Sequence, residues 1–224
     1  MIPRSAGLFY DRLLEEHGCC ARGLAFGSAA SLRLRFEAFA DLVSLEAGDQ
    51  ILDVGCGMAD FYHFLEERGF RGSYTGWDVS RRALAEARRR FPEIRRRLLL
   101  HDARQSNAPC RKAYDWVFCS GTFNVEFTED EACRAMGRLF ATSRKGFVAC
   151  FQNHYGTFGP PAADGFRRTK YLPDRLYRKA KESTPFVVVR DDYLPHDFLL
   201  ALFQKPFHER LGSSPKTVRR ESHE

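Results

Sequence analysis

A glycine turn in this sequence directly follows a short apolar run and precedes a helix-like pattern. The run is Gln50-Ile51-Leu52-Asp53-Val54, and the turn is Gly55-Cys56-Gly57. Glycines let the backbone turn tightly and approach a ligand where a Cβ would collide. A second apolar stretch ends in Asp78, 23 residues after Gly55, where an acid can accept hydrogen bonds from a ribose. The pattern predicts a nucleotide-binding unit of strand, turn and helix.

The residue types around the turn indicate which kind of nucleotide it binds. A dinucleotide fingerprint has a third glycine three residues after Gly57, and this chain has Asp60 there. A carboxylate at the start of the helix repels the pyrophosphate that a helix N-terminus otherwise attracts. Asp53 and Asp60 instead suit a ligand with a cationic amino-acid end and no phosphate. S-adenosylmethionine, with its sulfonium, ammonium, ribose and adenine, has that character.

The stretch Asp53-Val54-Gly55-Cys56-Gly57-Met58-Ala59 resembles the first motif of class I S-adenosylmethionine-dependent methyltransferases, Asp-x-Gly-x-Gly-x-Gly. Ala59 stands where the last glycine is usual, which narrows the space near the methionine part of the cofactor. The resemblance covers roughly residues 30 to 205. The segments 74–78, 120–124 and 192–198 are also similar to small bacterial methyltransferases of unassigned substrate.

The resemblance implies S-adenosylmethionine as the cofactor and assigns residues to it. The implied cofactor-binding residues are Asp53, Gly55, Cys56, Gly57, Asp60, Asp78, Val79, Asp102, Ala103 and Ser120. In this assignment Asp78 holds the ribose hydroxyls and Asp102 accepts from the adenine amino group, with Val79 and Ala103 flanking the base. Ser120 and Gly121 lie beneath the transferred methyl group.

The elements that must position these residues alternate regularly. Strands are expected at 50–54, 73–77, 98–100, 116–119 and 147–151, and each ends in polar residues or glycine. Helices lie between them, one capped by Ser80 and another by a capping box of Thr128 and Glu131. Alternation of this kind predicts an α/β fold, a mostly parallel sheet with helices on both faces and ligands at the carboxyl ends of the strands.

Two further strands, 185–189 and 198–203, are expected to close the chain as a hairpin. They resemble the sixth and seventh strands of the class I methyltransferase fold, in which the seventh is antiparallel. We therefore expect a seven-stranded sheet in a domain spanning 49–205. Residues 1–48 are expected to form an N-terminal helical cap, and 206–224 a basic, flexible tail.

The cap contributes two candidate site residues. Arg35 is expected to pair with the cofactor carboxylate, although Arg33 on the same helix is an alternative and both can be plain surface charges. Tyr10, next to Phe9, is a candidate for an apolar substrate wall, and core packing is the competing interpretation.

Methyl transfer depends chiefly on positioning, with a base if the nucleophile must lose a proton. Candidate catalytic residues are His154, in a long irregular stretch at 152–171, and Tyr193 and His196 in the final turn. Asn124 and Tyr155 are candidates for substrate binding. Each of these polar residues also has a structural interpretation, as a hydrogen-bonding turn residue or a packed tyrosine.

Composition limits the cellular context. The chain has 224 residues with 44% hydrophobic content, ample for a packed core. Seven scattered cysteines without a Cys-x-x-Cys pair or metal-like spacing predict reduced thiols and no metal site. With no secretory segment and no apolar run long enough to cross a membrane, we expect a cytoplasmic protein without a membrane partner. The oligomeric state is left open.

The sequence is compatible with three functions, of which methylation of a small molecule is favoured. The net charge of +6, much of it from arginines between 81 and 97, prompts the alternative of an RNA methyltransferase. Against it, the strand near 116–119 ends in Ser120-Gly121-Thr122-Phe123 and not in the Pro-Pro-aromatic motif that methylates exocyclic base amines. The third possibility is a non-catalytic S-adenosylmethionine-binding protein.

Overall fold

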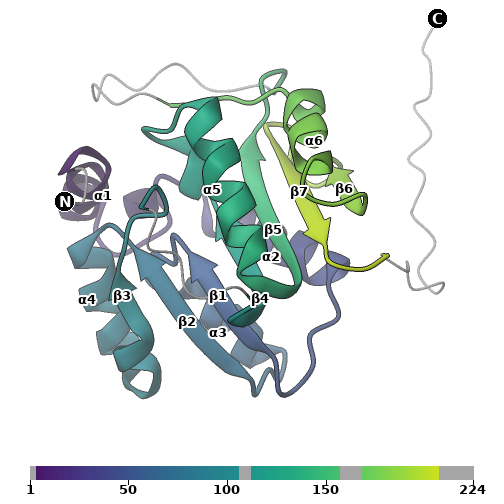
Figure 1. Ribbon diagram of the computed structural model, residues 1–224. Helices are drawn as coiled ribbons and strands as arrows, with labels where there is room; N and C mark the ends of the chain where they lie inside the picture. The colour runs from purple at the N-terminus through teal and green to yellow at the C-terminus, as the bar shows by residue number, and fades with distance from the viewer. Residues whose placement is uncertain (1–3, 106–111, 157–167, 207–224) are drawn as a thin grey trace, which may run out of the picture.

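The computed structural model of the chain describes residues 4–105, 112–156 and 168–206. Its centre is a seven-stranded sheet in the order β3-β2-β1-β4-β5-β7-β6 (Figure 1). The strands are β1 (Gln50–Val54), β2 (Ser73–Asp78), β3 (Leu98–Leu100), β4 (Tyr114–Ser120), β5 (Ser143–Gln152), β6 (Val187–Arg190) and β7 (Asp197–Phe203). Strands β1 to β5 pair in parallel, and β7 is antiparallel to both β5 and β6.

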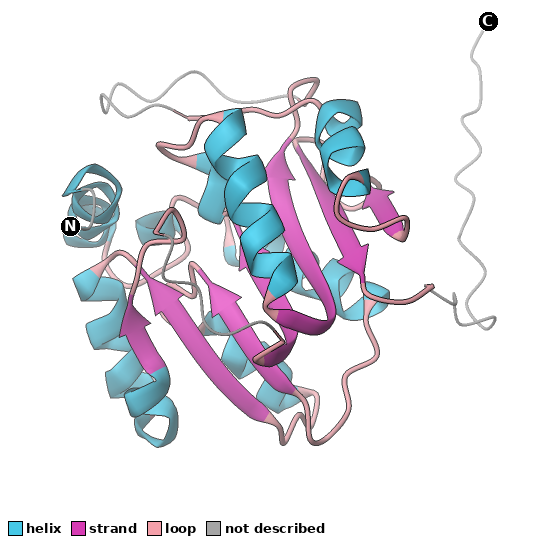
Figure 2. Cartoon of the chain, viewed as in Figure 1, coloured by secondary structure: helices cyan, strands magenta, loops and turns pink. Residues whose placement is uncertain are grey.

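Helices cover both faces of this sheet (Figure 2). They are α1 (Arg4–His17), α2 (Ala29–Leu42), α3 (Asp60–Glu67), α4 (Arg81–Arg90), α5 (Glu129–Ala141) and α6 (Pro173–Lys181). Short 3-10 turns occur at Arg22–Leu24, Pro92–Arg97 and Thr122–Asn124. The seven-stranded, mostly parallel sheet with an antiparallel last strand confirms the predicted fold class.

The alternation of side chains along each strand divides the core into two clusters. Ile51 and Phe118 face a cluster shared with α2, α3 and α4, whereas their neighbours Leu52 and Val117 face a cluster shared with α5 and α6. Both faces are apolar because each is covered by helices.

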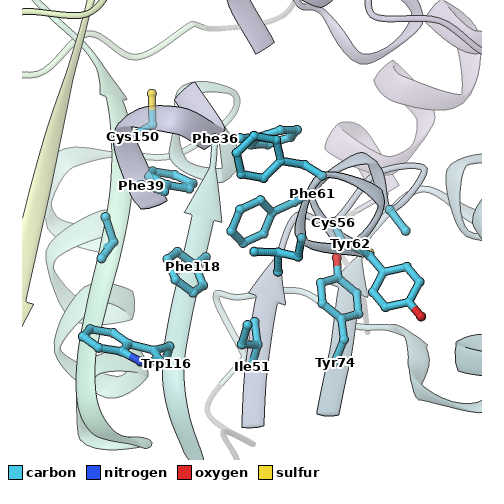
Figure 3. Close-up of a cluster of buried hydrophobic side chains, with 14 of the residues drawn as sticks. Phe36, Phe39, Ile51, Cys56, Phe61, Tyr62, Tyr74, Trp116, Phe118 and Cys150 are labelled. Atoms are coloured by element: carbon cyan, nitrogen blue, oxygen red, sulfur yellow. The ribbon is translucent and has the colours of Figure 1, made fainter. Parts of the chain in front are cut away.

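Aromatic rings fill the first of these clusters (Figure 3). Phe61 of α3 lies 5.0 Å from Phe36 and 5.7 Å from Phe39, both on α2, and 4.9 Å from Phe118 of β4, measured between ring centroids. Edge-to-face and tilted pairs at these distances stabilise the packing beyond the area they bury. The pairs fix α2 and α3 to the sheet, next to the glycine turn.

Local sequence signals for the helix starts are confirmed. The Ser80 side chain accepts from Ala83 N at the start of α4, and Thr128 and Glu131 form the expected capping box of α5. Strand β5 is longer than predicted, beginning at Ser143, because it follows the end of α5 almost without a loop. Residues 157–167, within the predicted irregular stretch, and 207–224, within the predicted tail, lie outside the described residues.

Two further observations concern membrane-spanning helices and the cysteines. Among the helices of the described ranges, none is both long and apolar enough to cross a membrane. Cys19, Cys20, Cys56, Cys119, Cys133 and Cys150 are all free thiols. The thiols of Cys56 and Cys119 are buried, and burial raises the pKa of each well above its ordinary value.

Candidate functional site

A cavity opens at the carboxyl ends of β1, β2, β4 and β5. Its volume is about 1140 Å³ when the part open to solvent is counted, which is large enough for a nucleoside-sized ligand and a second small molecule. The glycine turn after β1 forms its floor, and residues 24–26 with the first half of α2 close one side. The cavity therefore lies where ligands bind in open α/β sheets.

The glycine turn is fixed by close contacts that exclude other side chains. Gly55 has a φ of 77°, and a Cβ there would collide with the side chain of Thr122, whose hydroxyl donates to Val54 O. Gly57 has a φ of 54° and lies against Leu24. Ala59 also adopts the left-handed region, with a φ of 61°, and is fully buried at the start of α3. Ala59 thus adopts a backbone conformation that favours glycine.

Asp78, at the end of β2, is locked to this turn. Its Oδ2 accepts from Gly57 N at 2.8 Å, and its Oδ1 accepts from Ser80 N at 2.7 Å. Burial raises the pKa of Asp78, and the backbone donors partly offset this. The carboxylate lines the cavity with no cationic side chain as partner in the described contacts, so it remains available to a ligand.

Asp53, at the end of β1, is the second acid of the cavity. Tyr74 donates its hydroxyl to Asp53 Oδ2 at 2.6 Å, and Asp53 Oδ1 is buried without a hydrogen-bond partner. Burial raises the pKa of Asp53 to about 7; the Tyr74 hydrogen bond lowers it, and the charges of Asp78 and Asp60 raise it further. A cationic group placed here by a ligand would satisfy Oδ1 and stabilise the charged carboxylate.

Unpartnered polar atoms concentrate in the cavity. In the described part of the chain, five buried side-chain atoms lack a hydrogen-bond partner, and four belong to residues that line this cavity. The four are Asp53 Oδ1, His101 Nε2, Ser120 Oγ and Gln152 Oε1. Since buried polar groups in folded proteins are almost always paired, their concentration in one cavity indicates the place of a polar ligand.

Three other predicted cofactor residues line the cavity but already have charged partners within the chain. Asp60 pairs with Arg90 at 2.6 Å, and Asp102 pairs with Arg104 at 2.8 Å. Arg35 differs from expectation: it donates to Asp197 at 2.6 Å instead of standing free for a cofactor carboxylate. This partner could not be predicted from the sequence of the helical cap, because Asp197 lies 162 residues further along the chain.

The remaining predicted residues divide between the cavity and the surface. Val79, Ala103, Cys56, Tyr10 and Asn124 line the cavity. Burial, and next the charge of Asp78, raise the pKa of Tyr10, so its hydroxyl stays protonated and can donate.

The four candidates from the two late loops are not part of the cavity lining: His154, Tyr155, Tyr193 and His196. His154 is exposed, and Tyr155 is 75% exposed. The Tyr193 hydroxyl instead contacts Cys150 Sγ at 3.2 Å, on the far side of the Arg35–Asp197 pair. The geometry therefore gives these residues no contact with a ligand in the cavity.

Several lining residues were not predicted from the sequence. They include Phe26, His101, Arg104, Gln152 and Arg168. His101 follows β3 directly and could have been identified by the strand-end argument that identified Asp102. Phe26 carries no sequence signal, because it lies in an irregular segment. No cluster of three or more potential metal ligands occurs within the described ranges.

Comparison with known proteins agrees with this arrangement. Residues 51–146 match a family model described as a methyltransferase domain. A putative methyltransferase of Mycobacterium tuberculosis is 35% identical over 103 residues, covering 43% of this chain and 59% of that protein. The chain thus matches less than two thirds of the length of that relative.

Solved structures share the fold at low sequence identity. An S-adenosylmethionine-dependent methyltransferase from Mesorhizobium loti has a TM-score of 0.60 and 16% identity, covering 79% of this chain and 99% of that one. A magnesium protoporphyrin IX methyltransferase from Synechocystis has a TM-score of 0.58 and 15% identity, covering 90% and 92%. Residues 51–146 thus match a methyltransferase domain model, and the chain shares the fold of these S-adenosylmethionine-dependent methyltransferases.

Proposed function

We propose that the protein is an S-adenosylmethionine-dependent methyltransferase that methylates a small molecule. The observation that carries the proposal is the pair of acids in the cavity, Asp53 and Asp78, on either side of the glycine turn. One has a buried oxygen without a partner, and the other is held in place by the turn itself. Such a pair suits a ligand with a cationic group and a diol, and it repels a pyrophosphate.

Each part of S-adenosylmethionine has a matching group. Asp53 Oδ1 accepts from the ammonium, and Asp78 accepts from the ribose hydroxyls. Ala103 and Val79 border the adenine. A Synechocystis methyltransferase of the same fold holds S-adenosylmethionine, which supports the choice of cofactor.

In the reaction, the cofactor supplies a methyl group on a sulfonium, which is already a good leaving group. The protein's own residues orient the cofactor and the acceptor and exclude water. Asp53 and Asp78 would hold the methionine and ribose ends of the cofactor, and Ser120 and Gly121 line the same cavity on the side of β4. Phe26 covers Gly121, because a Cβ on Gly121 would lie 3.6 Å from its ring.

The arginines that prompted the RNA alternative are largely engaged within the chain. Arg82 pairs with Glu15, Arg89 with Glu86, and Arg90 with Asp60. The Arg88 guanidinium donates to Leu98 O, and Arg97 donates to Ser73 Oγ. Side chains held in this way contribute less to phosphate binding, which favours a small molecule over RNA.

Calorimetry on the wild type and on Asp78→Ala tests the cofactor assignment. S-adenosylmethionine should bind the wild type, and Asp78→Ala should weaken binding by at least about tenfold, since it removes acceptors for charged hydrogen bonds. Asp191→Ala, at an exposed turn, is the matched control and should bind normally. Unchanged affinity in Asp78→Ala would contradict the ribose assignment.

Transfer of a labelled methyl group tests the activity. The enzyme is incubated with methyl-labelled S-adenosylmethionine and the small-molecule, RNA and protein fractions of a cell extract. Label in the small-molecule fraction is the expected result. Nuclease-sensitive label would support the RNA alternative, and cofactor binding without any transfer would support a non-catalytic role.

A further inference from the structure

A ring of residues lies beside the cofactor half of the cavity and joins four separate parts of the chain. Gln152 N, at the end of β5, donates to Asn124 Oδ1 at 3.1 Å. Gln152 is in register with Asp197 of β7, which pairs with Arg35 of α2. The Arg35 guanidinium lies 4.9 Å from the ring of Phe26, and that ring lies against Gly121. Five residues of this ring line the cavity: Phe26, Arg35, Gly121, Asn124 and Gln152.

Two buried oxygens at this part of the cavity lack a hydrogen-bond partner: Gln152 Oε1 in the ring and Ser120 Oγ next to Gly121. A glutamine carbonyl oxygen can only accept, and a serine hydroxyl can accept as well as donate. The main chain of Gln152 is held on both sides, because its N donates to Asn124 and its O accepts from Tyr171 N at 2.8 Å. The acceptor oxygens are thus pre-positioned for a ligand that brings a donor.

Within the described part of the chain, the ring offers no free carboxylate that could act as a base toward the acceptor. Asp197 already neutralises Arg35 and is not a free base for an O–H acceptor. Two further arginines line the cavity: Arg104 pairs with Asp102, and Arg168 packs over Phe9 at 5.2 Å. The sulfonium of the bound cofactor would favour the neutral form of a basic nitrogen placed next to it.

We propose that this subsite takes a neutral nitrogen acceptor, an amine or related N–H compound, whose N–H donates to Gln152 Oε1. The inference rests on the proposed function. The nitrogen lone pair forms the new N–CH₃ bond as the S–CH₃ bond breaks, and the bond's electron pair stays on sulfur to give S-adenosylhomocysteine. The nitrogen, positively charged after transfer, then releases its proton to water, so the ring needs no base.

The test uses S-adenosylmethionine with a trideuterated methyl group and the small-molecule fraction of a cell extract, with products analysed by mass spectrometry. The expected product carries the label on nitrogen. Once that acceptor is isolated, Gln152→Leu should lower the transfer rate by about tenfold or more, because the N–H of the methyl acceptor loses its hydrogen-bond partner. Gln152→Glu, which keeps an acceptor oxygen, should retain more activity than Gln152→Leu, and Ser120→Ala should cost less than either.

Gln50→Leu, at the exposed amino end of β1, is the matched control and should react like the wild type. Calorimetry with S-adenosylhomocysteine on every variant verifies that folding and cofactor binding are intact. Label on oxygen, sulfur or carbon, or an N-methyl product whose formation is insensitive to Gln152→Leu, would overturn this inference alone. Cofactor binding without any labelled product would contradict the proposed function as well.

Discussion

Asp78 accepts a hydrogen bond from Gly57 N at 2.8 Å and thereby joins the end of β2 to the glycine turn after β1. The same carboxylate is buried, and burial raises its pKa above the ordinary value, so the folded protein carries its charge at a cost. Asp78 thus shapes the turn, whereas its buried charge lowers the stability of the folded protein.

Asp78→Asn should therefore separate stability from binding. The asparagine removes the buried charge but keeps only one of the two acceptor oxygens and sets its NH₂ group against a backbone N–H, so the two effects partly offset and the Tm should change by no more than a few degrees. Affinity for S-adenosylmethionine should fall at least about tenfold, because the charged acceptor of the ribose is lost. Thermal unfolding and calorimetry on the same samples measure both. A large loss of Tm would mean that the charge itself stabilises the turn.

The pKa of Asp53, raised to about 7 by burial, predicts that cofactor affinity depends on pH. The carboxylate must be charged to bind the ammonium, so affinity should fall as pH drops below 7, by up to about tenfold per pH unit. Asp53→Asn should bind more weakly and lose this slope. Calorimetry between pH 5.5 and pH 7 measures it, and a slope that persists in Asp53→Asn would assign the titration to another group.

The same group has the opposite effect on the stability of the cofactor-free protein. Since its pKa is higher in the folded than in the unfolded chain, the folded state binds more protons over the interval between the two values. The contribution of Asp53 to the free energy of unfolding should therefore decrease as pH rises from about 4 to about 7. Urea unfolding of the wild type and Asp53→Asn across this range tests the sign.

Tyr74→Phe should shift the binding profile toward higher pH. The Tyr74 hydroxyl donates to Asp53 Oδ2 at 2.6 Å, and this hydrogen bond lowers the pKa of the carboxyl group. Without it the pKa rises, so a higher pH is needed for the same cofactor affinity. Tyr62→Phe, which removes a hydroxyl that contacts Glu66 on the outside of α3, is the matched control and should leave the profile unchanged.

Ala59 should tolerate glycine but not a β-branched residue. Its left-handed backbone strains an L-residue, whereas its fully buried methyl group contributes packing, so Ala59→Gly should change stability by less than about 1 kcal/mol. Ala59→Val should destabilise by at least about 2 kcal/mol, because the branched side chain suits neither the backbone nor the space. Ala85→Val, at an exposed position on α4, should destabilise the protein by only a few tenths of a kcal/mol. Urea unfolding compares the three.

The features that sequence reasoning predicted well are those encoded locally. The caps at Ser80 and Thr128 depend on residues three positions apart, and strand-end acids such as Asp78 follow from strand periodicity. The mostly parallel, seven-stranded sheet with an antiparallel last strand followed from the alternation and from the family resemblance. The prediction that His154 serves the site used the same strand-end argument, but that argument gives the position of a residue and not the direction of its side chain, and His154 does not line the cavity.

Features that depend on distant partners were beyond such reasoning. The partner of Arg35 is on the last strand. Gln152 Oε1 lacks a partner because no hydrogen-bond donor of the described chain contacts it, which a sequence does not show. Gln152 directly follows the strand expected at 147–151, so its position could have been predicted, but the lack of a partner for its Oε1 could not.

The Arg35–Asp197 pair gives a last prediction, about how the helical cap is attached. Both side chains are buried, and the contact links α2 to β7, with Cys150 Sγ donating to the same carboxylate oxygen at 3.4 Å. Arg35→Met leaves Asp197 buried without its counter-ion and should destabilise the protein by about 3–5 kcal/mol. The double variant Arg35→Met with Asp197→Asn removes both charges and should recover a large part of that loss. Urea unfolding of the single and double variants gives the coupling energy. Simple additivity of the two substitutions would mean that the pair does not hold the cap to the sheet.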